Sequence, residues 1–137
     1  MEAINMMLQQ HILLAEDDSD LRELLQLVLE QSGYRVTGCS NGLELMEQLE
    51  AMANFDLVIS DIRMPALTGL EVLESQTMSL NKLPFICMTA FGDEATHAAA
   101  RRFGATAILD KPFDVDEMIT LVQKNLSSMS TLKQLRS

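Results

Sequence analysis

The chain has 137 residues, of which 47% are hydrophobic, and its 20 acidic and 10 basic side chains give a net charge of −10. This length and composition indicate one globular domain, and no apolar run reaches the roughly 18 residues of a membrane-spanning helix. The acidic balance disfavours direct nucleic acid binding, and the chain start lacks the pattern of a signal peptide, so we expect a cytoplasmic protein.

Short apolar segments alternate with amphipathic ones, a pattern typical of strands alternating with helices. The expected strands are residues 11–15, 34–39, 56–61, 84–89 and 105–109. The expected helices are residues 20–32, 41–53, 70–76, 95–103 and 114–126. We expect an N-terminal extension at 1–10, the folded domain at 11–126, and a polar tail or linker at 127–137.

Three of the expected helices begin with a capping pattern, in which an acidic or amide residue is followed three positions later by Glu. The pairs are Asp20 with Glu23, Asn41 with Glu44, and Asp114 with Glu117. The helix before Gly104 is rich in alanine, so it has a thin apolar face and is a candidate for shifting against the sheet. Cys39 and Cys87 have no metal-type spacing, and we expect two reduced structural thiols.

This alternation predicts an α/β fold, a doubly wound five-stranded parallel sheet with right-handed crossovers and five helices covering both faces. We expect the strand order 2-1-3-4-5, which makes the first and third strands neighbours. The carboxyl ends of all strands then lie along one edge, where open sheets of this kind bind ligands. Functional residues are therefore expected at that edge.

Three acidic residues converge at this edge of the predicted sheet. Glu16 and Asp17 follow the first strand and Asp61 ends the third, and neighbouring strands lie about 4.8 Å apart. Like charges this close raise a pKa or bind a cation, and oxygen ligands without nearby His or Cys favour Mg²⁺. Mg²⁺ held by one or two carboxylates keeps positions for phosphate oxygens, which suits phosphoryl transfer.

Asp61, Thr89 and Lys111 together suggest what this edge does. An Asp carboxylate can accept a phosphoryl group covalently, a Thr hydroxyl can hydrogen bond a phosphate oxygen, and a Lys can supply positive charge from a long side chain. Each residue alone also has a structural explanation, as a solvated loop Asp, a strand-end Thr or a solvated Lys. Their joint placement at successive strand ends favours a phosphoryl-transfer site.

Four motifs occur in a specific order: Ile-Leu-Leu-Ala-Glu-Asp-Asp at 12–18, Asp-Leu-Val-Ile-Ser-Asp-Ile-Arg-Met-Pro at 56–65 with Gly69, Met-Thr-Ala at 88–90, and Lys-Pro-Phe at 111–113. In these motifs the chain resembles the receiver domain of bacterial two-component response regulators, which has a flavodoxin-like fold. The resemblance covers residues 12–126.

The resemblance implies that a sensor histidine kinase or phosphotransfer protein phosphorylates Asp61. The implied Mg²⁺ ligands are Glu16, Asp17, Asp61 and the backbone carbonyl of Arg63, with Asp18 outside the set. Thr89 and Lys111 would contact the phosphoryl group, and the surface of the fourth helix, fifth strand and fifth helix would then control an output partner. That partner is an unknown protein or a missing effector domain, and phosphorylation-dependent dimerisation is one route to output.

The chain departs from the family pattern in two places. Ile108 stands three residues before the Lys, where the family often has Tyr or Phe, so the switch pair would be Thr89 and Ile108 without an aromatic ring. The last helix also lacks the basic residues that one DNA-binding class uses to dimerise. Residues 110–117 are more similar to receivers attached to ATPase-type transcription activators, or the chain is a stand-alone receiver.

Two other functions match parts of the sequence. A phosphatase with an Asp nucleophile would use Asp18 and Asp20, but this pair begins a helix. A flavin-binding domain shares the sheet order but needs a Ser-, Thr- or Gly-rich phosphate loop after the first strand, where this chain has acids. We therefore expect a signalling module and not an enzyme acting on a diffusible substrate.

Overall fold

The computed structural model describes residues 9–51, 54–64, 68–76, 82–90 and 93–136, with side chains as far as Ser127. Its strands are β1 (His11–Ala15), β2 (Arg35–Cys39), β3 (Leu57–Asp61), β4 (Phe85–Ala90) and β5 (Ala107–Lys111). Its helices are α2 (Ser19–Gln31), α3 (Gly42–Glu50), α4 (Gly69–Gln76), α5 (Glu94–Arg102) and α6 (Val115–Arg136). Strands and helices alternate as the hydrophobic pattern predicts.

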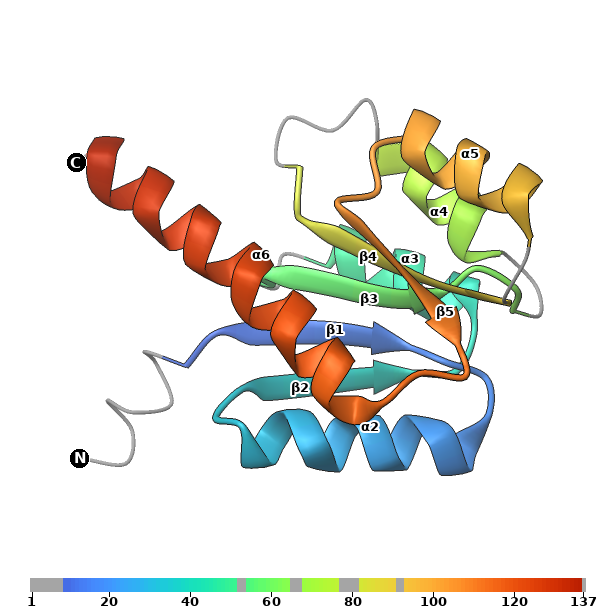
Figure 1. Ribbon diagram of the computed structural model, residues 1–137, viewed down its shortest axis with the longest axis horizontal. Helices are drawn as coiled ribbons and strands as arrows, with labels where there is room; N and C mark the ends of the chain where they lie inside the picture. The colour runs from blue at the N-terminus through green and yellow to red at the C-terminus, as the bar shows by residue number, and fades with distance from the viewer. Residues whose placement is uncertain (1–8, 52–53, 65–67, 77–81, 91–92, 137) are drawn as a thin grey trace.

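The strands form one parallel sheet in the order β2-β1-β3-β4-β5, which confirms the predicted fold class (Figure 1). Ala15 pairs with Ser60 on β3, and Thr89 on β4 pairs with Asp110 on β5. The carboxyl ends of β1, β3, β4 and β5 therefore lie side by side, and this edge of the sheet carries the candidate site.

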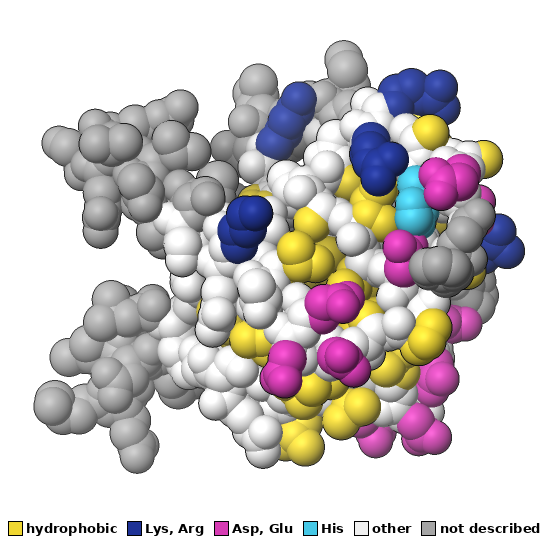
Figure 2. Space-filling view, in the orientation of Figure 1, with side chains coloured by type: hydrophobic (Ala, Val, Ile, Leu, Met, Phe, Trp, Pro, Cys, Tyr) yellow, Lys and Arg dark blue, Asp and Glu magenta, His cyan; other side chains and the backbone are white. Residues whose placement is uncertain are grey.

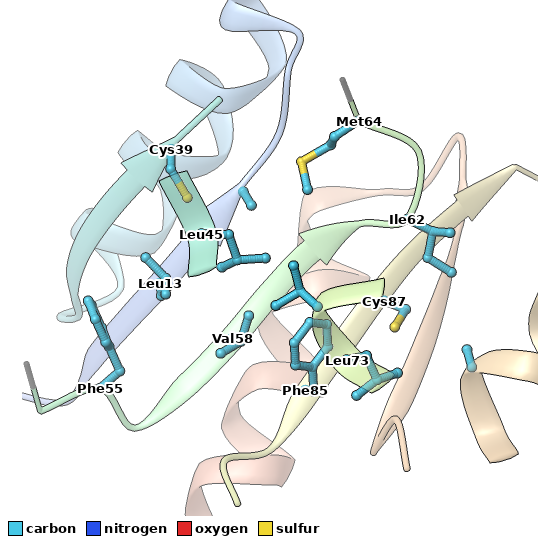
Figure 3. Packing of buried hydrophobic residues seen from close by; sticks show 13 residues of the cluster. Leu13, Cys39, Leu45, Phe55, Val58, Ile62, Met64, Leu73, Phe85 and Cys87 are labelled. Atoms are coloured by element: carbon cyan, nitrogen blue, oxygen red, sulfur yellow. The ribbon is translucent and has the colours of Figure 1, made fainter. Parts of the chain in front are cut away.

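Each face of the sheet is covered by its own group of helices. On one face, α2 and α6 pack against alternate strand residues, and the buried cluster contains Ile12, Leu14, Leu25, Leu29, Leu57, Ile59, Ile86, Met88, Leu109, Met118, Val122 and Leu126. On the other, α3, α4 and α5 cover a cluster that includes Leu13, Cys39, Leu45, Val58, Leu73, Phe85, Cys87 and Ala100 (Figure 3). Because side chains alternate along a strand, consecutive strand residues belong to opposite clusters.

Helix caps follow the sequence in one place and differ in another. Asn41 caps α3, and its side-chain oxygen accepts the Glu44 backbone N–H at 2.8 Å, as predicted. The cap predicted at Asp20 is wrong, because Asp18 caps α2 and accepts from the N–H groups of Asp20 and Leu21. Both Asp residues suit the role by chemistry, and the chain path after β1 selects the earlier one.

The ends of two elements also differ from the prediction. β5 begins and ends two residues later than expected and includes Asp110 and Lys111. The segment predicted as a polar tail is the last part of α6, which continues to Arg136 and extends past the sheet (Figure 1). Leu126 is the last buried side chain among those described, so the domain boundary after it stays a prediction. Met52 and Ala53 of the second predicted helix lie outside the described residues.

The surface agrees with the acidic composition. On the face seen in Figure 2, acidic side chains are interspersed with hydrophobic ones, and Lys and Arg side chains lie apart from one another. No helix among the described residues is long and apolar enough to cross a membrane. Cys39 and Cys87 are free, buried thiols in the same apolar cluster, as expected for structural cysteines.

Candidate functional site

Three carboxylates meet at the carboxyl edge of the sheet. Glu16 directly follows β1 and is fully buried, Asp17 is exposed, and Asp61 is the last residue of β3 and is buried. One carboxylate oxygen from each lies within 4.8 Å of the others. The three acidic residues therefore lie close together, as the predicted strand order implied.

Asp61 is held by its own loop. Its Oδ1 accepts the backbone N–H of Arg63 at 2.9 Å, and its backbone carbonyl accepts the Ser60 hydroxyl at 2.9 Å. Its other oxygen, Oδ2, lies 2.7 Å from the Lys111 ammonium. One carboxylate oxygen is thus fixed by the turn after β3, and the side chain keeps a single orientation toward the sheet edge.

Gly69 is necessary for the close approach of α4 to the end of β3. A Cβ atom built at this position would overlap the Asp61 carbonyl oxygen and lie 2.7 Å from the Ser60 hydroxyl oxygen. The Gly69 N–H also donates to the Ile62 carbonyl at 3.0 Å. The backbone that carries Asp61 therefore packs directly against the start of α4.

Lys111, the last residue of the outermost strand β5, contacts two of the carboxylates. Its ammonium Nζ lies 2.6 Å from Glu16 Oε1 and 2.7 Å from Asp61 Oδ2. Burial alone would lower the pKa of Lys111, but its hydrogen bonds to Asp61 and Glu16 raise that pKa above its ordinary value. A fixed positive charge therefore lies between the two buried acids, as expected for Lys111.

Glu16 is an acid whose pKa is strongly shifted by its surroundings. Burial raises the pKa of Glu16 to about 7, the nearby Asp17 and Asp61 add to the increase, and the Lys111 hydrogen bond opposes it. A buried carboxylate whose charge is this costly has a strong preference for a partner cation. The site can satisfy that preference with Lys111 or with a metal ion.

The chemistry of the donor set fits Mg²⁺. The three carboxylates supply oxygen only, and Mg²⁺ takes oxygen ligands at about 2.0–2.1 Å in an octahedron, so opposite ligands lie about 4.2 Å apart. Ligand oxygens within 4.8 Å of one another need only small side-chain adjustments to reach that geometry. The Arg63 carbonyl, the fourth predicted ligand, stays a prediction.

Asp18 has a different role from its acidic neighbours. Its side chain accepts two backbone N–H groups at the start of α2, and its own N–H donates to Glu16 Oε2 at 3.3 Å. This agrees with its predicted place outside the ligand set. A carboxylate used as a helix cap is also poorly placed as a nucleophile, which removes the basis for the phosphatase alternative.

Thr89 and Lys111 border the same groove as Asp61. The groove has a volume of about 530 Å³, and Leu24, Ala90 and Phe113 are among the other side chains along it. The Thr89 hydroxyl oxygen lies 3.1 Å from the Ala90 carbonyl, 3.0 Å from Asp110 Oδ1 and 2.8 Å from His97 Nε2. The hydroxyl predicted to contact a phosphoryl group thus has partners on the α5 and β5 side.

His97 is the residue that the sequence reasoning missed. It is one of the two buried residues of α5 and lies against Thr89 and Asp110. The signal available in the sequence was a polar ring three residues before buried Ala100, on the same helix face. Ile108, the predicted switch position, is partly buried against the α3, α4 and α5 cluster and has no polar side-chain atom.

A family model of the response regulator receiver domain matches residues 12–123. The chain belongs to this family. It is a signalling domain of two-component response regulators, as the motifs indicated, and the flavin-binding and phosphatase alternatives are not favoured.

Two similar transcriptional regulators are longer than this receiver domain. It is 38% identical over 122 residues to the DNA-binding transcriptional regulator NtrC of Escherichia coli (strain K12), a match that covers 89% of this chain and 26% of NtrC. It is 31% identical over 113 residues to the transcriptional regulatory protein FixJ of Bradyrhizobium diazoefficiens, covering 82% of this chain and 55% of FixJ. The chain therefore spans only part of the length of these relatives.

Solved receiver structures have the same fold. The response regulator protein TrrA of Thermotoga maritima, in complex with Mg²⁺ and BeF, is 31% identical with a TM-score of 0.77, covering 86% of this chain and 100% of TrrA. A response regulator receiver domain protein from Clostridium thermocellum is 26% identical with a TM-score of 0.81. The match covers 90% of this chain and 98% of the chain in that structure. This receiver domain thus corresponds to structures that consist of little else.

Proposed function

We propose that Asp61 is the phosphoacceptor of this receiver domain and takes a phosphoryl group from the phosphohistidine of a sensor histidine kinase or phosphotransfer protein. The observation that carries the proposal is the Lys111 ammonium, 2.7 Å from Asp61 Oδ2, within a cluster of three carboxylates at one sheet edge. An acid that is buried, oriented by a turn and paired with a cation has the properties of an activated oxygen nucleophile.

In the proposed step an Asp61 carboxylate oxygen attacks phosphorus in line with the phosphohistidine. A P–O bond forms to Asp61, the P–N bond breaks, and the imidazole leaves with its bonding electron pair and takes up a proton. Lys111 compensates the charge on the transferring oxygens as the carboxylate loses its own charge. Preorganised positive charge of this kind lowers the barrier, because the site does not have to reorganise during the reaction.

We propose that Mg²⁺ is the cofactor, held by Glu16, Asp17, Asp61 and the Arg63 carbonyl. When bound, the ion supplies positive charge that neutralises the transferring phosphoryl oxygens and aligns them. Two of the proposed ligands are already held in place, because Glu16 and Asp61 are fixed by burial and by backbone hydrogen bonds. Asp17, which is exposed, is the carboxylate that is free to adjust.

After transfer, Thr89 and Lys111 would contact the new phosphoryl oxygens. A phosphoryl group adds roughly two negative charges and three acceptor oxygens. These oxygens would attract the Lys111 ammonium and the Thr89 hydroxyl toward Asp61. Their movement would change the surface of α5, β5 and α6. That surface would act on an output partner, either another protein or an effector domain, with phosphorylation-dependent dimerisation as one route, and without turnover of a diffusible substrate.

The test is phosphorylation in vitro. With acetyl phosphate or a phosphorylated histidine kinase and Mg²⁺, the parent should gain one phosphoryl group, which is stable in acid and labile in base. Asp61→Asn should gain none. Asp116→Asn, on the exposed side of α6, is the matched control and should be labelled like the parent. Equal labelling of Asp61→Asn and the parent would overturn the assignment.

A further inference from the structure

Thr89, His97 and Asp110 form a polar cluster next to the phosphoacceptor edge, in which Thr89 and His97 are buried and Asp110 is partly exposed. His97 Nε2 lies 2.6 Å from Asp110 Oδ1 and 2.8 Å from Thr89 Oγ1, and Thr89 Oγ1 lies 3.0 Å from the same Asp110 oxygen. Thr89 and His97 are almost completely buried, at 3% and 7% exposure. Each of the three atoms therefore contacts the other two.

Three elements bring the cluster together. Thr89 and Asp110 are paired in register on β4 and β5, so their side chains leave the sheet on the same face. Their neighbours Met88 and Leu109 belong to the cluster on the α2 and α6 face, which places Thr89 and Asp110 on the opposite face, under α5. His97 reaches down from α5 to meet them.

The hydroxyl proton of Thr89 is already used by an acceptor next to it. A carboxylate only accepts, so the 2.6 Å contact with Asp110 requires a proton on His97 Nε2. The Thr89 hydroxyl has one proton to donate, to Asp110 or to the Ala90 carbonyl, and its oxygen faces the imidazole N–H. No hydroxyl proton is left for a second acceptor, so Thr89 must give up its hydrogen bond to Asp110 or to the Ala90 carbonyl before it can donate to a phosphoryl oxygen.

We propose that His97 is a positioning residue for Thr89. It holds the Thr89 hydroxyl in the unphosphorylated orientation and ties that hydroxyl to α5, so that the proposed capture of a phosphoryl oxygen by Thr89 releases the helix. The inference rests on the proposed function at Asp61 and adds the link from that site to α5.

A second contact supports α5 as the element that is released. Asp93 caps the start of α5 by accepting the Thr96 N–H. Its carboxylate also lies 2.9 Å from the guanidinium of Arg63, a residue two positions after Asp61. The Arg63 side chain is 78% exposed, so this surface pair contributes little energy. The buried contact with His97 is the stronger of the two connections between the site and α5.

The test is the affinity for beryllofluoride, a stable mimic of an aspartyl phosphate, measured with Mg²⁺. His97→Leu has a similar volume but no hydrogen bond to hold Thr89, so it should bind beryllofluoride roughly threefold to tenfold more tightly than the parent. His97→Gln can still donate an N–H from a similar position and should bind like the parent. A His97→Leu affinity equal to or weaker than the parent's would overturn the proposal, as would a His97→Gln that behaves like His97→Leu.

Two further variants separate positioning from general packing. Asp110→Ala removes the shared acceptor from a side chain that is 38% exposed, so it should fold even if His97→Leu does not, and should also bind more tightly. In a Thr89→Ala background, His97→Leu should change nothing, because its effect passes through the hydroxyl. An unchanged effect in that background would contradict the proposal.

The same measurements distinguish this inference from the proposed function. A parent protein that binds no beryllofluoride in the presence of Mg²⁺ would overturn both. Suppose instead that the parent binds beryllofluoride, that Asp61→Asn does not, and that the His97 and Asp110 variants bind it with the parental affinity. This result would overturn only the role of His97.

Discussion

The ammonium of Lys111 lies 2.7 Å from Asp61 Oδ2, although the two residues are 50 positions apart in the chain. Two strand ends make this contact possible, because Asp61 ends β3 and Lys111 ends β5, with only β4 between them. The Lys side chain crosses the end of β4 to reach the acids. In the unphosphorylated domain it supplies the cation that Glu16 and Asp61 need.

We expect Lys111→Met to destabilise the metal-free domain by roughly 1–3 kcal/mol, because two buried carboxylates lose a charged hydrogen-bond donor. The loss should be smaller in Mg²⁺, since the metal can replace the missing charge. Urea unfolding with and without Mg²⁺ measures both effects. Lys124→Met, at an exposed position of α6, is the control and should change little. A Lys111→Met variant as stable as the parent without Mg²⁺ would contradict this account of the site.

Mg²⁺ should raise the melting temperature of the parent, and Asp17→Asn should abolish most of that increase. A ligand at 100 times its dissociation constant adds about 2.7 kcal/mol of stability, which is easily measured. Asp18→Asn is a matched control at the next residue, because Asn also caps helices well and Asp18 is outside the proposed ligand set. It should respond to Mg²⁺ like the parent. Equal responses of Asp17→Asn and Asp18→Asn would place the metal elsewhere.

The pKa of Glu16 predicts a dependence on pH. Burial raises that pKa from 4.5 to about 7, so the folded state retains a proton that the unfolded state has lost between these values. The contribution of Glu16 to metal-free stability therefore falls as the pH rises from 4.5 to 7 and is level above 7.

Mg²⁺ needs the ionised carboxylate, so the melting shift that it produces should be larger at pH 8 than at pH 5.5. Melting curves of the parent and Glu16→Gln, each with and without Mg²⁺ at both pH values, test this. Glu16→Gln should lose the metal-free decline between the two pH values. A parent whose Mg²⁺ shift is the same at both would show that Glu16 does not limit metal binding.

The sequence was informative about the acidic edge because chemistry and topology agree there. Glu16, Asp17 and Asp61 follow apolar strands, and a parallel sheet places such residues together whatever the details of packing. Lys111 was also identified, although β5 was predicted to end before it. Polar residues such as Asp110 and Lys111 weaken the strand pattern, yet an edge strand with one hydrogen-bonded neighbour accommodates them.

The contact between Thr89 and His97 could not be predicted in the same way. It depends on the register of β4 against β5 and on the rotation of α5 over the sheet, neither of which is set by local sequence. The helix cap at Asp18 is a similar case, because Asp18 and Asp20 have equal chemistry and only the backbone path distinguishes them. From the sequence we also expect the side chain of Phe91, in the loop before α5, to respond to phosphorylation, and this residue lies outside the described residues.

Gly69→Ala should destabilise the domain by roughly 1–3 kcal/mol, since overpacking forces the backbone to move. The added methyl would overlap the Asp61 carbonyl, so phosphorylation by acetyl phosphate should also slow. Gly38→Ala is the control, because its Cβ would meet the flexible end of Gln26 at 3.0 Å and not a backbone atom. If both variants kept parental stability and labelling, the contact between α4 and the end of β3 would not matter for the site.

Helix α5 is the element that we expect to respond most to phosphorylation. Helix α5 buries only His97 and Ala100, a thin face that agrees with its alanine-rich sequence, so little apolar contact holds it once Thr89 moves. Strand β5 is held to β4 by a ladder of backbone pairs, and Ile108 has no hydroxyl with which to exchange a surface hydrogen bond for a buried one. Amide hydrogen exchange with Mg²⁺ and beryllofluoride should therefore show its main changes in residues 90–104. Asp61→Asn, treated in the same way, should show none of them. Changes confined to β5 around Ile108, with α5 unchanged, would mean that the signal leaves the site by another route.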